Sequence, residues 1–217
     1  MTKDKLYLSL QIFTMSSEVK KILEAEAKAV LNIPATDNFE KACDLIYESV
    51  HRKGGKVVAS GMGKAGQIAL NIATTLSATG TPAIFLHPAD AQHGDLGVIQ
   101  PNDILLLVSN SGKTLEILEL YELGKRLGYN MHTIVITGNA DSELGHLADV
   151  TISTGHPDEV CPLGLTPTTS TTVMTVIGDA LVVLMMKKIG FTAADYAKRH
   201  HGGYLGIKSR HAAQNEK

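Results

Sequence analysis

The feature that most constrains the fold is a regular alternation of short apolar runs and longer amphipathic runs that begins at Lys56. The apolar runs are rich in valine, isoleucine and leucine and have the length of strands, and segments long enough for crossover helices separate them. Strands are predicted at 56–60, 82–86, 103–108, 131–136 and 149–152, and helices at 63–78, 113–127, 168–189 and 192–199. This alternation predicts an α/β fold, in which a doubly wound, parallel, five-stranded sheet of the flavodoxin-like kind carries helices on both faces.

Two more helices are predicted before the alternation, over 17–31 and 37–52, because a serine and an aspartate stand at their starts as caps. At 217 residues the chain is long enough for one domain with a full apolar core. We therefore expect one domain over 16–208, with flexible termini at 1–15 and 209–217.

Two polar turns follow the first and third predicted strands. They read Ser60-Gly61-Met62-Gly63-Lys64 and Ser109-Asn110-Ser111-Gly112-Lys113-Thr114. Hydroxyls, backbone N–H groups and the positive ends of the helices that follow suit a phosphate dianion. A lysine in the first turn of a helix is disfavoured by the helix dipole, so Lys64 favours an anionic partner over a solvated surface position. We expect both turns to bind one phosphorylated ligand, with Ser60, Ser109, Asn110, Ser111 and Thr114 as contacts.

The pattern Gly61-x-Gly63-x-x-Gly66 also satisfies the fingerprint of dinucleotide binding. That interpretation needs an acidic residue at the end of the second strand to hold the ribose hydroxyls. Here the second strand ends in His87-Pro88, and Asp90 comes late. A phosphorylated ligand without a redox cofactor is therefore the better prediction.

Several groups that can take part in proton transfer surround these turns in the sequence. Each has an ordinary structural explanation, because acids favour helix starts and histidines commonly complement helix ends. Together they supply two carboxylates, an ammonium group and imidazoles around a phosphate site, which suits proton transfer next to a carbonyl. The groups are Glu116, Glu159, His87, His93, His200 and Lys64.

Composition excludes some classes of partner. A net charge of −2 gives no electrostatic reason to expect nucleic acid. Cys43 and Cys161 are too few for a disulfide framework, and the apolar run 6–15 lacks the small-residue cleavage site of a signal peptide, so we expect a reducing, cytoplasmic setting. The most apolar stretch, Val173–Met186, is interrupted by polar residues and is predicted to be a buried helix or a subunit interface rather than a membrane span.

Taken in order, the motifs resemble the sugar-isomerase (SIS) domain of arabinose 5-phosphate isomerases over roughly residues 18–208. As an ordered set the resemblance is specific, whereas Ser-x-Ser-Gly alone indicates only a generic SIS domain. Besides the two polar turns, the matching strings are Ser77-x-x-Gly80-Thr81-Pro82, His87-Pro88-Ala89, His93-Gly94-Asp95-Leu96-Gly97, Cys161-Pro162-Leu163-Gly164-Leu165, Gly178-Asp179-Ala180-Leu181 and Gly190-Phe191-Thr192-Ala193.

The resemblance implies interconversion of D-ribulose 5-phosphate and D-arabinose 5-phosphate through an enediol, which supplies Kdo for lipopolysaccharide or capsule. It implies catalytic roles for Lys64, Glu116, Glu159 and His200. Which of the last three removes the carbon proton stays open. It implies further substrate contacts at Gly80, Thr81, His87 and His93.

The resemblance also implies partners and ligands. It implies a homotetramer with shared active sites, in which His93 reaches the sugar from a neighbouring subunit. It further implies inhibitory zinc at His87. A separate hypothesis is that, without CBS domains, feedback acts at or beside the active site through CMP-activated Kdo, which carries a phosphate and a related sugar. The family commonly carries two CBS domains after the SIS domain, and we expect a form without them. Where the family has His-Pro-Gly-Gly, this chain has His200-His201-Gly202-Gly203, which loosens the backbone that positions His200.

Two other functions remain as alternatives. A non-catalytic SIS module that senses sugar phosphates has no need of Lys64, Glu116, Glu159 and His200 together. An isomerase of another phosphosugar, such as a hexose or heptose phosphate, needs the same chemistry and differs only in the length of its substrate.

Overall fold

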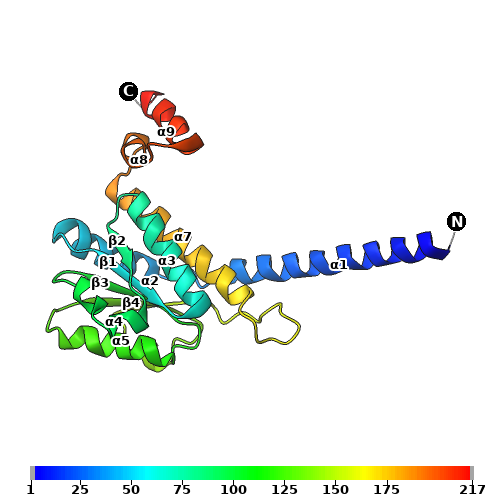
Figure 1. The fold of residues 1–217 in the computed structure, drawn as a ribbon, viewed down its shortest axis with the longest axis horizontal. Coiled ribbons are helices and arrows are strands. Elements are labelled where there is room, and N and C mark those ends of the chain that lie inside the picture. The colour runs from blue at the N-terminus through cyan, green and yellow to red at the C-terminus, as the bar shows by residue number, and fades with distance from the viewer. Residues whose placement is uncertain (1–2, 216–217) are drawn as a thin grey trace.

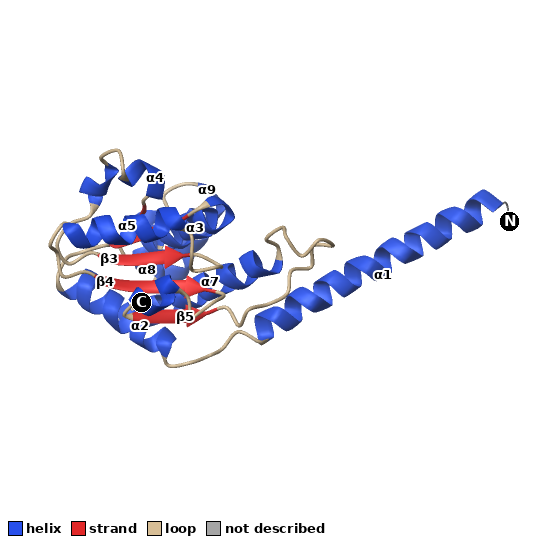
Figure 2. Cartoon of the chain, turned by 90° about the horizontal axis from the view of Figure 1, so that it is seen from below, coloured by secondary structure: helices blue, strands red, loops and turns tan. Residues whose placement is uncertain are grey.

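The fold is a parallel sheet with helices on both faces (Figures 1 and 2). The computed structural model describes residues 3–215, with side chains over 15–214. Its five strands pair in the order β2-β1-β3-β4-β5, and every pair is parallel. The strands are β1 (Val57–Gly61), β2 (Ala83–Phe85), β3 (Ile104–Val108), β4 (His132–Thr137) and β5 (Val150–Ser153). The predicted doubly wound sheet is confirmed, and each strand begins within a residue of its predicted start.

Most of the predicted helices are present in the structure. Its helices are α1 (Lys3–Leu31), α2 (Asn38–Ile46), α3 (Gly63–Ala78), α4 (Pro88–Ala91), α5 (Leu115–Arg126), α6 (Glu143–Leu147), α7 (Thr169–Ile189), α8 (Ala193–Arg199) and α9 (Gly203–Asn215). The predicted helices 63–78, 113–127, 168–189 and 192–199 correspond to α3, α5, α7 and α8. The short helices α4 and α6 were not predicted, because four or five residues are too few to establish a helical period.

Two apolar cores cover the two faces of the sheet. Every residue of β1 and β3 is buried, as expected of central parallel strands. Along β3, Leu106 faces the core that α2, α3 and α7 cover, whereas Leu105 and Leu107 face the core that α4, α5 and α6 cover. The alternation of side chains along each strand therefore builds both layers at once.

The N-terminal helices differ from the prediction. α1 begins at Lys3, so Ser17 lies inside the helix and does not cap it, and the helix extends away from the body of the molecule (Figure 1). α2 continues into a π-helical turn over Tyr47–Arg52. The Asp37 carboxylate makes no capping hydrogen bond and instead pairs with Lys41 Nζ at 2.8 Å. The flexibility predicted for residues 1–15 and 209–217 concerns motion and stays a prediction. Residues 1–2 and 216–217 lie outside the described part of the chain.

Helix α7 packs over one face of the sheet, beside α3. Among the described residues it is long and apolar enough to cross a membrane by length and composition, but half of its most apolar window is buried inside this chain. It packs closely on α3, where a Cβ added at Gly178 would lie 2.5 Å from Ile72 Cγ1. This packing agrees with the predicted buried helix.

Candidate active site

The sheet topology brings the two predicted phosphate turns together. In the strand order β2-β1-β3, the crossovers from β1 and β3 leave on opposite faces, and ligands of such sheets bind beside that switch point at the carboxyl ends of the strands. A cavity of about 580 Å³ lies there, lined by the turns after β1, β3, β4 and β5 and by the first turn of α7. Of the predicted site residues, Lys64, Ser109, Asn110, Ser111 and Thr114 line this cavity.

The turn after β3 is fixed by its own hydrogen bonds. Ser109 Oγ lies 2.9 Å from Thr114 Oγ1 and accepts a hydrogen bond from the Gly112 backbone N–H at 3.2 Å. Gly112 has a φ of +63°, and a Cβ at this position would overlap Ser142 Oγ. Only glycine therefore fits here, and the turn presents its hydroxyls to the cavity in one arrangement.

In the turn after β1, Lys64 faces the cavity whereas Ser60 lies in the core. Lys64 lies in the first turn of α3, is exposed, and lines the cavity. Ser60 is fully buried, and its hydroxyl donates to the Leu86 carbonyl at 2.6 Å. The Ser60 hydroxyl thus links β1 to the end of β2 and does not line the cavity.

Glu159 lies at the N-terminal end of α7, behind the cavity wall. Its Oε2 accepts hydrogen bonds from the Thr168 N–H at 2.7 Å, the Thr168 hydroxyl at 2.8 Å and the Ser170 N–H at 3.3 Å. Burial by itself raises the pKa of Glu159, but hydrogen bonds from Ser170 and Thr168 outweigh it and hold the pKa below its ordinary value. Glu159 is therefore a carboxylate rather than a carboxylic acid at neutral pH.

The cavity is electropositive. The N-terminal turns of α3, α5 and α7 all reach it, and two lysines, Lys64 and Lys113, line it. Among its described lining residues there is no aspartate or glutamate. Converging helix dipoles and ammonium groups without a compensating carboxylate favour a dianionic ligand.

Other predicted site residues lie outside this cavity. Glu116 lies in the first turn of α5, one residue beyond the helix start, but does not line the cavity. His87 caps α4, its Nδ1 accepting from the Ala89 N–H at 3.3 Å, and His93 is exposed just after α4. These three side chains lie near the carboxyl ends of the strands, but none of them lines the cavity.

Gly80 and Thr81 lie just before β2, at the amino-terminal ends of the parallel strands, whereas the cavity lies at their carboxyl ends. Thr81 is buried, with its hydroxyl 3.2 Å from His51 Nε2. Gly80 packs against Phe191, where an added Cβ would lie 2.8 Å from the ring. Within one chain, neither residue can touch a ligand bound in the cavity.

His200 is farther still from the cavity. The cavity lies at the start of α7, whereas His200 follows α8 beyond the end of α7, and a helix of 21 residues is about 30 Å long. Its ring stacks on Tyr196 with centroids 3.7 Å apart.

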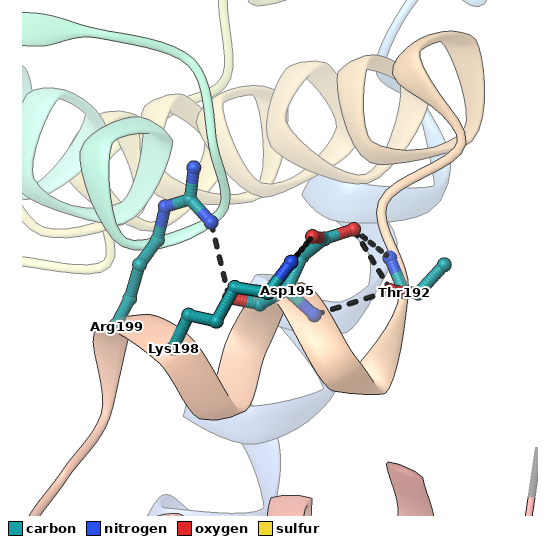
Figure 3. Close-up of polar contacts among 4 residues, drawn as sticks. All are labelled: Thr192, Asp195, Lys198 and Arg199. Carbon is teal, nitrogen blue, oxygen red and sulfur yellow. Dashed lines mark hydrogen bonds and ion pairs between the residues drawn. The ribbon is translucent and has the colours of Figure 1, made fainter.

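The helix that carries His200 starts with a capping box (Figure 3). Thr192 Oγ1 accepts from the Asp195 N–H at 3.1 Å, and the Asp195 carboxylate accepts from the Thr192 hydroxyl at 2.8 Å and from Lys198 Nζ at 3.0 Å. Hydrogen bonds from Thr192 and then from Lys198 lower the pKa of Asp195 to about 2. The polar start of α8, rather than a buried core, thus fixes its geometry.

The predicted zinc ligand has an incomplete set of neighbours. Beside His87, the acidic side chain of Asp90 lies 3.9 Å from Nδ1, and the described residues contain no group of three histidine, cysteine or acidic side chains placed to hold a metal ion. One chain therefore does not supply a zinc site at His87, and we derive no step through a metal.

Several cavity residues were not predicted, and two of them follow strands of the sheet. Asn139 follows β4 and His156 follows β5, and both line the cavity. Neither belongs to a recognisable motif. Their one signal in the sequence is position, because each comes two or three residues after the end of a parallel strand.

Comparison with known proteins agrees with this geometry. Residues 51–184 match the family described as the SIS domain. Proteins named arabinose 5-phosphate isomerase KdsD are similar in sequence: the one from Yersinia pestis is 47% identical over 186 residues, and the one from Escherichia coli K12 is 45% identical over the same length. Each alignment covers 86% of this chain, and this chain spans 55% of each relative.

Solved structures give the same result. A Bacteroides fragilis protein named as a candidate phosphosugar isomerase involved in capsule formation is 64% identical, with a TM-score of 0.86, over 88% of this chain and 99% of its own. An Escherichia coli CFT073 protein solved in complex with arabinose 5-phosphate is 34% identical, with a TM-score of 0.75, over 92% of this chain and all of its own.

Proposed function

Because this chain belongs to the SIS domain family, we propose that it is an aldose–ketose isomerase that interconverts D-ribulose 5-phosphate and D-arabinose 5-phosphate. The relatives named for this activity, at 45–47% identity, support the choice of substrate. The observation that carries the proposal is the cavity at the switch point of the sheet, with three helix N-termini, two lysines and no carboxylate among its described lining residues.

The phosphate of the substrate occupies the turn after β3. Ser109, Ser111 and Thr114 surround it with hydroxyls, and the start of α5 adds unpaired backbone N–H groups. Lys64 faces the same space from the start of α3, where its ammonium group stabilises negative charge on the phosphate or on the enediolate.

The isomerisation itself moves one proton between C1 and C2 through an enediol and requires no redox cofactor. Glu159 is ionised and so can accept a proton in its proposed role, but the hydrogen bonds from the start of α7 that lower its pKa also make it a weaker base than a free glutamate. Glu116 and His200 supply the remaining acid–base groups.

The site is completed in a homotetramer. His200, Gly80 and Thr81 are too far from the cavity of their own chain to reach its ligand, so the proposed roles of these residues require another subunit. Large apolar side chains are exposed on the protruding α1 and on α9, as expected of surfaces that pack in an assembly, and they include Val19, Leu23, Leu205 and Ile207. His93, exposed after α4, reaches the sugar of a neighbouring site in the same assembly.

The cellular role follows from the substrate. The product enters Kdo synthesis for lipopolysaccharide or capsule in the cytoplasm. CMP-activated Kdo, which carries a phosphate and a related sugar, competes for the same cavity. Titration calorimetry with this nucleotide sugar checks the feedback: no heat of binding at millimolar concentration contradicts it. Zinc, if it inhibits, requires ligands from a second subunit beside His87.

Proton NMR of the chain mixed with D-ribulose 5-phosphate in D2O tests the activity. We expect D-arabinose 5-phosphate to form, without ribose 5-phosphate, and with deuterium at C2. Chemical-shift changes without turnover contradict the isomerase and favour a sensor of sugar phosphates.

A further inference from the structure

We infer that His156 is a further catalytic residue, the group that carries the hydroxyl proton between O1 and O2 of the sugar. The inference rests on the proposed isomerase function and assigns one of its proton transfers. His156 lies in the loop after β5, contributes to the cavity wall, and was not among the residues that the motifs identified.

The imidazole of His156 is held in a defined orientation. Its Nδ1 lies 3.1 Å from the Gly138 carbonyl oxygen, and the Gly138 N–H donates to the Asn110 carbonyl at 3.0 Å. A carbonyl oxygen can only accept, so Nδ1 carries the proton. In the neutral ring Nε2 is then unprotonated and free to accept.

The backbone around His156 supports the same conclusion. His156 has a φ of +55°, in the left-handed region that few non-glycine residues occupy, directly after Gly155 at +77°. Such a conformation costs about 1 kcal/mol or more and persists where surrounding contacts fix it, most often at functional sites. The contact partner Gly138 packs closely against Asn110, because an added Cβ would lie 2.5 Å from Asn110 Oδ1, so a larger residue does not fit there.

The other lining groups cannot perform this transfer. The titratable side chains among the described lining residues are Lys64, Lys113 and His156. A lysine ammonium group offers donors and no acceptor, whereas an imidazole both accepts and returns a proton. Glu159 accepts three hydrogen bonds behind the wall and is not a lining residue. Within one chain, His156 is therefore the cavity's own proton carrier.

The transfer balances without a co-reactant. A separate base removes the C1 proton of the ketose, and the electron pair forms the C1–C2 double bond while O2 becomes an oxyanion. The O1 hydroxyl proton moves to Nε2 of His156, which becomes an imidazolium that keeps its Nδ1–H bond to Gly138. Nε2 then returns this proton to O2, and the C1–O1 carbonyl forms as C2 accepts the carbon proton.

The test compares His156→Asn with the wild type and with His146→Asn, which alters a histidine on α6 away from the cavity. In D2O we measure kcat, KM and the ratio of C1-proton exchange to isomerisation, using D-ribulose 5-phosphate. We expect His156→Asn to lower kcat about 100-fold. The exchange ratio should rise, because the carbon base still works, while KM stays near the wild-type value. His146→Asn should behave as the wild type.

Three outcomes separate the possibilities. Absence of turnover by the wild type overturns the proposed function itself. Turnover by the wild type with unchanged kcat in His156→Asn overturns the role of His156. A parallel fall of exchange and isomerisation also overturns it, because that indicates a structural role. If His156→Asn has a lowered Tm, His156→Gln, whose longer amide also reaches for the Gly138 carbonyl, is measured against the same criteria.

Discussion

The two ends of α7 differ in how strongly one chain fixes the two halves of the proposed site. At its start, α7 meets the turns after the parallel strands, and Lys64, Ser109 and Thr114 converge there. At its other end α7 leads into α8, a helix with no buried residue. Tyr196 lies on α8, and His200 follows it. The first half is built by strands that must end side by side, whereas the second half projects from the body of the molecule (Figure 1).

This comparison supports the proposal that the fold of one chain specifies phosphate binding and that assembly with another subunit completes the chemistry. Parallel pairing forces the loops after β1 and β3 to one edge of the sheet, so sequence order alone brings the two turns together. Nothing in the described part of one chain forces His200 to the same edge. Substitutions at either end of α7 should therefore differ in their effects on binding and on turnover.

Removing the ammonium group of Lys64 from the cavity should have the largest effect. We expect Lys64→Met to lower kcat/KM by about 100- to 1,000-fold, because one charged group that stabilises a developing oxyanion contributes that much. Lys53→Met, at an exposed lysine near the opposite edge of the sheet, should keep wild-type activity. Steady-state kinetics measure kcat/KM in both variants. Equal losses of kcat/KM contradict the assignment of Lys64 to the site.

Glu159→Gln should lower kcat about 100-fold, the usual contribution of a general base or acid. It should also change how stability depends on pH. The folded-state pKa of Glu159 lies below its ordinary value of 4.5, so its carboxylate contributes stability above that pH and loses it as the pH falls through the folded-state pKa.

The difference in unfolding free energy between wild type and Glu159→Gln should therefore be constant from pH 7 to about 5 and shrink below pH 4.5. Chemical denaturation at a series of pH values measures it. A difference that instead grows on acidification contradicts the carboxylate bound at the start of α7.

Gly112→Ala should distort the phosphate turn. The positive φ and the overlap of a Cβ with Ser142 Oγ predict a loss of about 2–3 kcal/mol in unfolding free energy and about a tenfold rise in KM. Gly128→Ala is the matched control, since Gly128 also has a positive φ, +76°, but open space around it. Its loss should be about 1 kcal/mol with an unchanged KM. Equal changes in KM would remove the turn from the site.

Thr192→Ala should have the smallest effect, because it acts on His200 only through α8. Loss of the cap costs about 1 kcal/mol of helix stability, so kcat should fall by no more than the roughly fivefold that this free energy corresponds to, with unchanged substrate affinity. Thr74→Ala, which removes an exposed hydroxyl bonded within α3, is the control. If Thr192→Ala raises the Kd for substrate and leaves kcat unchanged, α8 acts in binding rather than in proton transfer.

How far the sequence predicts this molecule depends on whether the relevant contacts are local. The strands and the helices α3, α5, α7 and α8 have clear periodicity, and the phosphate turns follow from strand order. Other features depend on distant contacts. Ser60 was expected to touch substrate, but its hydroxyl donates to Leu86, which follows another strand. Asp37 pairs with Lys41 instead of capping α2.

The cavity residue His156 has no motif, and only the path of the loop after β5 places it on the wall. The separation of His200 from the cavity follows from the length of α7, which the sequence does predict, but a separation by itself does not say which subunit closes the gap.

Mixing two inactive variants shows whether one site takes residues from two subunits. Lys64→Met and His200→Asn, each inactive alone, are unfolded together, refolded as a mixture and assayed for isomerisation. If each site takes its cavity from one chain and His200 from another, random assembly should restore about a quarter of the wild-type sites. If the mixture stays as inactive as its components, both residues act within one chain, and the account of a site completed by assembly is wrong.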